Sequence, residues 1–76
     1  MTLYDAGLPP TYTLTARQAE VLQCCAEGLS EREIADALHI GLRTVKTHSQ
    51  AIRVRLGARN MAHAVYIAVR LGLIKL

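Results

Sequence analysis

The sequence predicts an all-α fold: one four-helix domain with a central helix-turn-helix and a C-terminal dimerisation helix. Three observations support this prediction. Apolar residues recur at helical spacing through most of the 76 residues. Capping residues and glycines divide the chain into four such segments. No segment shows the period-two alternation that is typical of a half-buried strand.

The first 13 residues differ in composition from the rest of the chain. They contain both prolines, as Pro9-Pro10, and show no helical period. We therefore expect residues 1–13 to form an arm or linker, and residues 14–76 to form the domain.

The first two predicted helices each begin at a capping box. In this motif a hydroxyl and a second polar side chain three residues later satisfy each other's free backbone amides. Thr15 and Gln18 form the first box, and Ser30 and Glu33 the second. Gly28 ends the first helix as a left-handed cap. The apolar stripes of these two helices are Val21, Leu22, Cys25 and Ala26 in the first, and Ile34, Ala35 and Leu38 in the second.

The third and fourth predicted helices follow two short breaks. A tight turn at residues 39–41, with Ile40 reaching the core, leads into a helix that begins after Gly41 and runs to Leu56. After the break at residues 57–59, Asn60 can cap a helix from Met61 to Leu71.

The second and third predicted helices, of about 8 and 15 residues, form a helix-turn-helix because a short turn with a glycine joins them. In this motif the second helix enters the major groove. At 100° per residue, one side of it carries Val45, Ser49, Ile52 and Leu56, which we expect to pack inward. On the exposed part we assign Lys46, Thr47 and Gln50 to base edges, and Arg43, Thr44, Arg53 and, from the preceding helix, Arg32 to phosphates. The alternative is that these are ordinary solvated side chains, and His48 is expected to be structural.

Charge is sorted along the chain. Residues 1–36 hold six acids and two bases, whereas residues 37–76 hold seven bases and no acid. A domain with a pI near 9.2 and this asymmetry is typical of proteins that bind a polyanion. A solvated basic face is the alternative. The exposed face of the third helix is expected to be free of acids.

The adjacent cysteines, Cys24 and Cys25, are badly placed to bond each other on a helix. They also lack the spacing of a zinc or redox site. We expect them to be small apolar groups in the core of a reduced protein, and we expect no metal and no cofactor.

The last predicted helix is apolar nearly all round, although a surface helix of a small monomer should have a polar face. We expect it to pair with the same helix of a second copy about a two-fold axis. The candidate contacts are Val65, Tyr66, Val69 and Ala62, and the small residues Ala64 and Ala68 would allow close approach. The alternative is a monomer in which the N-terminal arm folds over this face.

Several ordered segments resemble the LuxR/GerE-type DNA-binding domain over about residues 14–74. They are Leu14-Thr15-Ala16-Arg17, Glu20-Val21-Leu22, Glu27-Gly28-Leu29-Ser30, Glu33-Ile34-Ala35, Thr44-Val45-Lys46-Thr47-His48 and Leu56-Gly57. The resemblance implies a bacterial or phage transcription regulator whose third helix reads inverted repeats and whose fourth helix forms the dimer. It also implies a structural pair between Arg17 and Glu20. Only 13 residues precede the matching segment, and Met1 favours a stand-alone regulator over a fragment.

Three positions depart from the family pattern. Ser49 stands where an apolar residue is usual, Ala51 where an asparagine is usual, and Met61 where an arginine is frequent. The first is expected to loosen the core slightly, and the second removes a polar contact from the recognition helix. These departures bear on the target sequence rather than on nucleic-acid binding.

The sequence therefore predicts a homodimeric, sequence-specific regulator bound to double-stranded DNA, with RNA polymerase or another LuxR-type regulator as further candidate partners. It is expected to be cytoplasmic and associated with the nucleoid, because it lacks a signal peptide and a membrane-spanning run. An enzyme is not expected, since no paired carboxylates or nucleophile–base pair is visible. The main alternative is a protein-interaction module that heterodimerises with a larger LuxR-type regulator and antagonises it. A promoter-binding region of a sigma factor is a second alternative.

Overall fold

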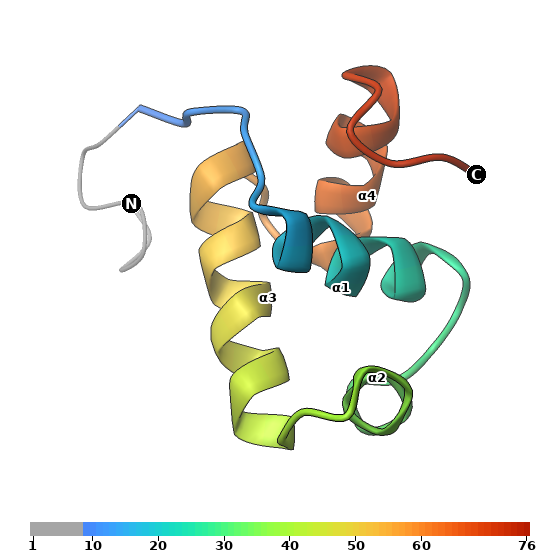
Figure 1. The fold of residues 1–76 in the computed structure, drawn as a ribbon. Coiled ribbons are helices and arrows are strands. Elements are labelled where there is room, and N and C mark those ends of the chain that lie inside the picture. Colours follow the sequence, from blue (N-terminus) through green and yellow to red (C-terminus); the bar gives the residue numbers. More distant parts are fainter. Residues whose placement is uncertain (1–8) are drawn as a thin grey trace.

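A computed structural model describes residues 9–76, which form four α-helices and no strand (Figure 1). The helices are α1 (Ala16–Ala26), α2 (Glu31–Leu38), α3 (Leu42–Leu56) and α4 (Met61–Arg70). The predicted all-α class and the four helices are confirmed. The prediction was wrong at the end of α4, which stops at Arg70 and has Leu71 as its C-cap. Residues 1–8 of the predicted arm lie outside the described residues.

Both predicted capping boxes are present. At α1, the Gln18 amide donates to Thr15 Oγ1 at 3.1 Å, and the Thr15 amide donates to Gln18 Oε1 at 3.0 Å. At α2, the Glu33 amide donates to Ser30 Oγ at 3.2 Å, and the Ser30 amide donates to Glu33 Oε1 at 2.8 Å. The hydrogen bonds from the Ser30 backbone and hydroxyl lower the pKa of Glu33, because they stabilise its carboxylate. The boxes therefore define where α1 and α2 begin.

The connection between α2 and α3 is the tight turn of a helix-turn-helix. His39 ends α2 in the left-handed conformation, with φ of 57°. Ile40 is half-buried against the core, and its amide donates to the Ala35 carbonyl at 3.0 Å. Gly41 is the N-cap of α3 and supplies no side-chain cap, as its lack of a side chain requires. The central helix-turn-helix is confirmed.

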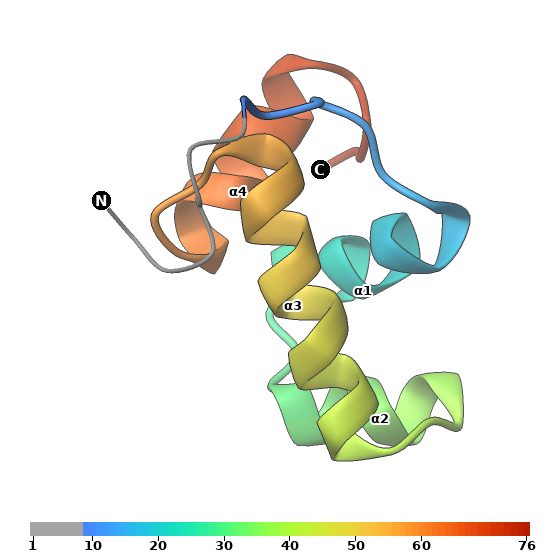
Figure 2. The same cartoon turned by 90° about the vertical axis from the view of Figure 1, so that its left-hand side faces the viewer.

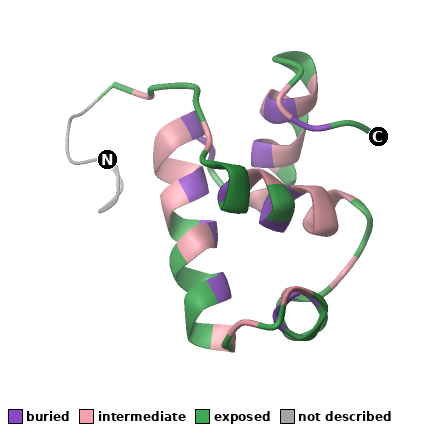
Figure 3. Cartoon of the chain, viewed as in Figure 1, coloured by how far each residue is buried: buried purple, intermediate pink, exposed green. Residues whose placement is uncertain are grey.

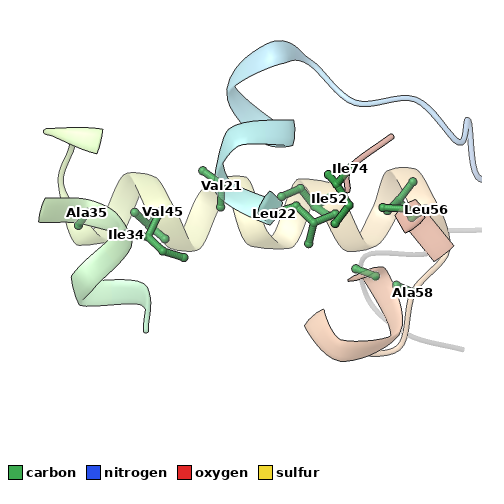
Figure 4. Packing of buried hydrophobic residues seen from close by; sticks show 11 residues of the cluster. Val21, Leu22, Ile34, Ala35, Val45, Ile52, Leu56, Ala58 and Ile74 are labelled. Carbon is green, nitrogen blue, oxygen red and sulfur yellow. The ribbon is translucent and has the colours of Figure 1, made fainter. Parts of the chain in front are cut away.

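The core lies along one side of α3. Val45, Ile52 and Leu56 are fully buried there, as the helical period predicted. Figure 4 shows Ile34 and Ala35 of α2 near Val45 at one end of the core, and Leu22, Ile74 and Ala58 near Ile52 and Leu56 at the other. α1 and α3 each contact all three other helices, whereas α2 and α4 are not in contact. Removing α3 would therefore leave the two ends of the domain joined through α1 alone.

Part of the predicted arm is bound to the C-terminal end of α3. The Tyr12 amide donates to the Arg55 carbonyl at 2.8 Å, and Arg55 Nε donates to the Thr13 carbonyl at 3.0 Å. Arg55 Nη2 also donates to Thr13 Oγ1 at 3.2 Å. In Figure 1 this segment crosses the end of α3 before it enters α1. Residues 9–13 are therefore held at the end of α3, whereas the rest of the arm, which the alternative to a dimer would place over α4, lies outside the described residues.

We predict that Gly57→Ala lowers the free energy of unfolding by more than the 1–2 kcal/mol or so expected for alanine in the left-handed conformation. Gly57 has φ of 64°, and a Cβ there would lie 2.6 Å from Pro10 Cγ. The matched control is Gly72→Ala, because Gly72 has φ of 74° but has no atom within 4 Å of the added Cβ. Urea unfolding of both variants measures the difference. Equal losses would contradict the contact between the arm and α3.

Candidate nucleic-acid interface

α3 presents one buried side and one exposed side. Val45, Ser49, Ile52 and Leu56 are all buried, including the serine that stands at an apolar position of the family pattern. The opposite side faces solvent, and Figure 2 shows α3 lying in front of the rest of the domain when the chain is viewed from that side. In Figure 3 the buried positions follow one edge of α3 along its length. The helical period therefore predicted correctly which side of α3 is free to bind a partner.

Four of the predicted contact residues gather on this exposed side, which we call the recognition surface: Arg43, Lys46, Thr47 and Gln50. Together with Leu42 they line a shallow hollow of about 480 Å³. Thr47 Oγ1 donates to the Arg43 carbonyl at 3.1 Å, so its hydroxyl keeps its oxygen lone pairs for a further donor. The surface combines two cations, an amide and a hydroxyl, which together can bond to phosphates and to base edges.

α3 itself carries no acid, as its sequence requires, but an acid of α2 reaches the recognition surface. Lys46 Nζ donates to Glu31 Oε1 at 3.0 Å and forms an ion pair with it. Glu31 is the first residue of α2, so the acid comes from the neighbouring helix and not from α3. The helix-turn-helix brings the two side chains together although they lie 15 residues apart in the sequence. Lys46 is therefore already engaged in the protein without DNA.

The remaining predicted contact residues lie outside the hollow. Thr44 is exposed on the first turn of α3, and Arg32 is exposed on the first turn of α2. Arg53 and His48 are half-buried further along α3. Arg17, which was not counted as a DNA contact, pairs with Glu20 at 3.4 Å, as the resemblance implied.

α4 differs from the prediction in how it is oriented. Ala64 and Ala68 are 0% exposed inside the domain's own core, so they are not available for close approach of a second copy. The outer face instead carries Tyr66, which is 58% exposed. Arg70 Nη1 donates to Tyr66 Oη at 3.0 Å and its guanidinium lies 5.7 Å from the ring centroid, while His63 stacks on the same ring at 6.5 Å. The outer face of α4 is therefore partly polar.

The predicted dimer contacts divide according to this orientation. Ala62 and Tyr66 are exposed, whereas Val65 and Val69 are half-buried and also pack against the domain core. All four side chains keep some surface in contact with solvent. A partner would therefore meet a strip along one side of α4 rather than a wholly apolar helix.

Sequence reasoning missed two long-range side-chain contacts, those of Glu31 with Lys46 and of Arg55 with Thr13. The sequence shows Glu31 only as one of six acids in residues 1–36, and Arg55 only as one of seven bases in residues 37–76. No local signal pointed to Glu31, whose partner Lys46 lies 15 residues away in the sequence. No local signal pointed to Arg55, whose partner Thr13 lies 42 residues away in the sequence.

Cys24 and Cys25 are free thiols on α1, half-buried against the core. Burial raises the pKa of both thiols, and the charges of Glu27 near Cys24 and of Glu31 near Cys25 raise it further. Residues 9–76 contain no cluster of three side chains able to hold a metal ion. No helix in that part of the chain is long and apolar enough to span a bilayer.

A helix-turn-helix whose second helix exposes basic and hydrogen-bonding side chains defines a DNA-binding domain. The family model described as "Bacterial regulatory proteins, luxR family" (GerE) matches residues 12–68. The chain therefore belongs to the luxR family, which consists of DNA-binding transcription regulators and not of enzymes.

Individual relatives agree with this assignment. The chain is 41% identical over 61 residues to the transcriptional activator protein BjaR1 of Bradyrhizobium diazoefficiens, covering 80% of this chain and 25% of BjaR1. It superposes on the solved structure of the transcription factor GerE with a TM-score of 0.79 and 29% identity, covering 82% of this chain and 92% of that one. A Vibrio cholera VqmA–ligand–DNA complex gives a TM-score of 0.75 and 31% identity, over 90% of this chain and 30% of that one. The chain spans 25–30% of the length of the curated relatives it matches.

We predict that both cysteine thiols react more slowly with Ellman's reagent in the folded chain than in concentrated urea at the same pH. A raised pKa leaves less of each thiol as the reactive thiolate, and burial limits access to it. Stopped-flow absorbance at mildly alkaline pH measures both rates. A folded-state rate equal to the rate in urea would contradict a structural role for the pair.

Proposed function

We propose that this chain regulates transcription as a homodimer that reads an inverted-repeat operator in double-stranded DNA through α3. The observation that carries the proposal is the recognition surface, which is exposed on the second helix of a helix-turn-helix in a luxR-family domain. The similarity to a domain in a VqmA–ligand–DNA complex supports DNA as the partner. The domain proposed to do this comprises residues 14–76.

The proposed division of labour follows from position and chemistry. Lys46 and Thr47 lie in the first half of α3 and Gln50 just past its middle, so all three fall toward the N-terminal part that meets bases when such a helix enters the major groove. A lysine can donate to guanine O6 and N7, and a glutamine can bond to adenine N6 and N7. The proposed phosphate contacts, which hold the helix in register, are Arg43, Thr44, Arg53 and Arg32.

The proposed dimer uses the strip of Ala62, Tyr66, Val69 and Val65 on α4. Tyr66 offers a large, half-exposed ring whose hydroxyl is already held by Arg70, so little side-chain freedom is lost on association. Two copies related by a two-fold axis would present two α3 helices to half-sites about one helical turn of DNA apart. An inverted repeat is the DNA sequence with the same symmetry.

With DNA as the proposed target, we expect the regulator to be associated with the nucleoid in the cytoplasm. RNA polymerase or a larger LuxR-type regulator are further proposed partners. The alternative function, antagonism of a larger regulator through α4, would use the same strip without requiring the recognition surface.

Selection of bound duplexes from a random pool at about 150 mM salt tests the proposal, because binding that depends only on phosphates is weak at that salt concentration. Static light scattering on the same sample gives the molar mass of the protein, which distinguishes a dimer from a monomer. An inverted repeat bound by a dimer supports the regulator. Recovery of no motif would contradict sequence-specific binding and would favour antagonism of a larger regulator.

We predict that Lys46→Ala weakens binding to the selected duplex by about 1–3 kcal/mol, the usual effect of losing one base contact. Fluorescence anisotropy with a labelled duplex measures the change. Lys75→Ala is the matched control, because Lys75 is an exposed lysine on the C-terminal tail, where its backbone bonds to Gln23 of α1. Equal effects of the two variants would contradict the assignment of the recognition surface.

We predict that Ala62→Glu shifts the chain from dimer to monomer and lowers affinity for the full inverted repeat at least about tenfold, since a dimer gains from binding two linked half-sites. A charge at the N-terminal end of the strip would have to be desolvated in the interface. Sedimentation velocity and anisotropy measure the two effects. Ala16→Glu, at the exposed first residue of α1, is the control and should leave both unchanged. A dimeric Ala62→Glu variant would rule out this strip as the interface.

A further inference from the structure

The ion pair between Glu31 and Lys46 joins the two helices of the helix-turn-helix at the recognition surface. Lys46 Nζ and Glu31 Oε1 lie 3.0 Å apart, and the side chains of Glu31 and Lys46 remain 44% and 60% exposed, respectively. An exposed pair of this kind adds little to folding stability. Lys46 lines the hollow on α3, and Glu31 approaches it from the first turn of α2. The pair therefore needs an explanation other than stability.

We propose that Glu31 is a specificity-determining residue that weakens non-specific DNA binding by holding the Lys46 ammonium away from phosphates and orienting it toward base edges. This inference rests on the proposed function of α3. It adds to that function a residue outside α3, on the first turn of α2, whose carboxylate contacts the proposed base contact Lys46.

The ammonium group can serve both partners at once. A lysine carries three N–H donors, and Glu31 Oε1 accepts one of them. The other two stay available on the side of the hollow, where a base acceptor at a correct site can receive them. A phosphate attracts the Lys46 ammonium mainly through its full negative charge, and that attraction must compete with the carboxylate already beside the ammonium. Glu31 therefore penalises phosphate-only complexes more than complexes with the correct base.

The neighbouring Glu33 does not have this relationship to Lys46. The Glu33 carboxylate accepts a hydrogen bond from the Ser30 amide in the capping box, which holds it at the N-terminal end of α2. Both glutamates lie in the first turn of the same helix and both carry one negative charge. Glu33→Gln is therefore a matched control for Glu31→Gln, and glutamine can still complete the capping box.

The test compares two probes: the duplex selected by the wild-type chain and a random-sequence duplex. For Glu31→Gln we expect binding to the random duplex to tighten roughly 3- to 10-fold, the size expected for one exposed charge contact. The slope of log K against log salt should steepen by about one unit, because Lys46 gains one phosphate contact. Binding to the selected duplex should change less, so the ratio of the two affinities falls. Glu33→Gln should leave that ratio unchanged.

A double variant shows whether Glu31 acts through Lys46. In the Lys46→Gln background, Glu31→Gln should no longer change the salt slope. An undiminished effect in that background would mean that Glu31 repels phosphates directly and would overturn the proposal, as would an unchanged affinity of the single variant for random DNA. If Lys46→Ala lowers affinity for the selected duplex but Glu31→Gln has no effect, this inference alone fails. If the pool yields no motif, the proposed function fails and the inference fails with it.

Discussion

The burial of one side of α3 is the constraint on which the rest of the structure depends. Val45, Ser49, Ile52 and Leu56 pack inward, and through them α3 contacts α1, α2 and α4. Because a helix buries only the stripe that faces its neighbours, the same packing leaves the opposite stripe in solvent. One helix of this 76-residue chain thus supplies both the stripe against which the other three helices pack and the proposed binding surface.

The electrostatics of the domain follow from how α2 meets α3. The acids of the chain lie in its first half and the bases mostly in its second, so the two kinds of charge meet where those halves pack. Glu31 and Lys46 form that contact at the recognition surface, whereas Glu33 is retained by the α2 capping box. The carboxylate of Glu31 on α2 therefore lies beside the proposed base contact Lys46 on α3.

The two ends of the chain are tied to the same framework. The Arg55 side chain donates to the Thr13 carbonyl, and the Tyr12 amide donates to the Arg55 carbonyl. These bonds hold residues 9–13 across the end of α3. The Gln23 side chain of α1 donates to the Lys75 carbonyl and accepts from the Lys75 amide. The preceding residue, Ile74, is buried in the core. These contacts leave one side of α4, with Tyr66 at its centre, exposed on the domain surface. The surfaces proposed for DNA and for a second copy consequently lie on different helices.

The sequence by itself determined the four helices, the capping boxes of α1 and α2 and the buried side of α3, because caps and helical periods act within a few residues of the chain. It could not determine the orientation of α4, since a helix that is apolar nearly all round has no periodic signal, and only packing against α1 and α3 put Ala64 and Ala68 inside. It likewise could not pair Glu31 with Lys46 or Arg55 with Thr13. Those pairs depend on how helix axes cross and how far side chains reach, and both are decided only when the core forms.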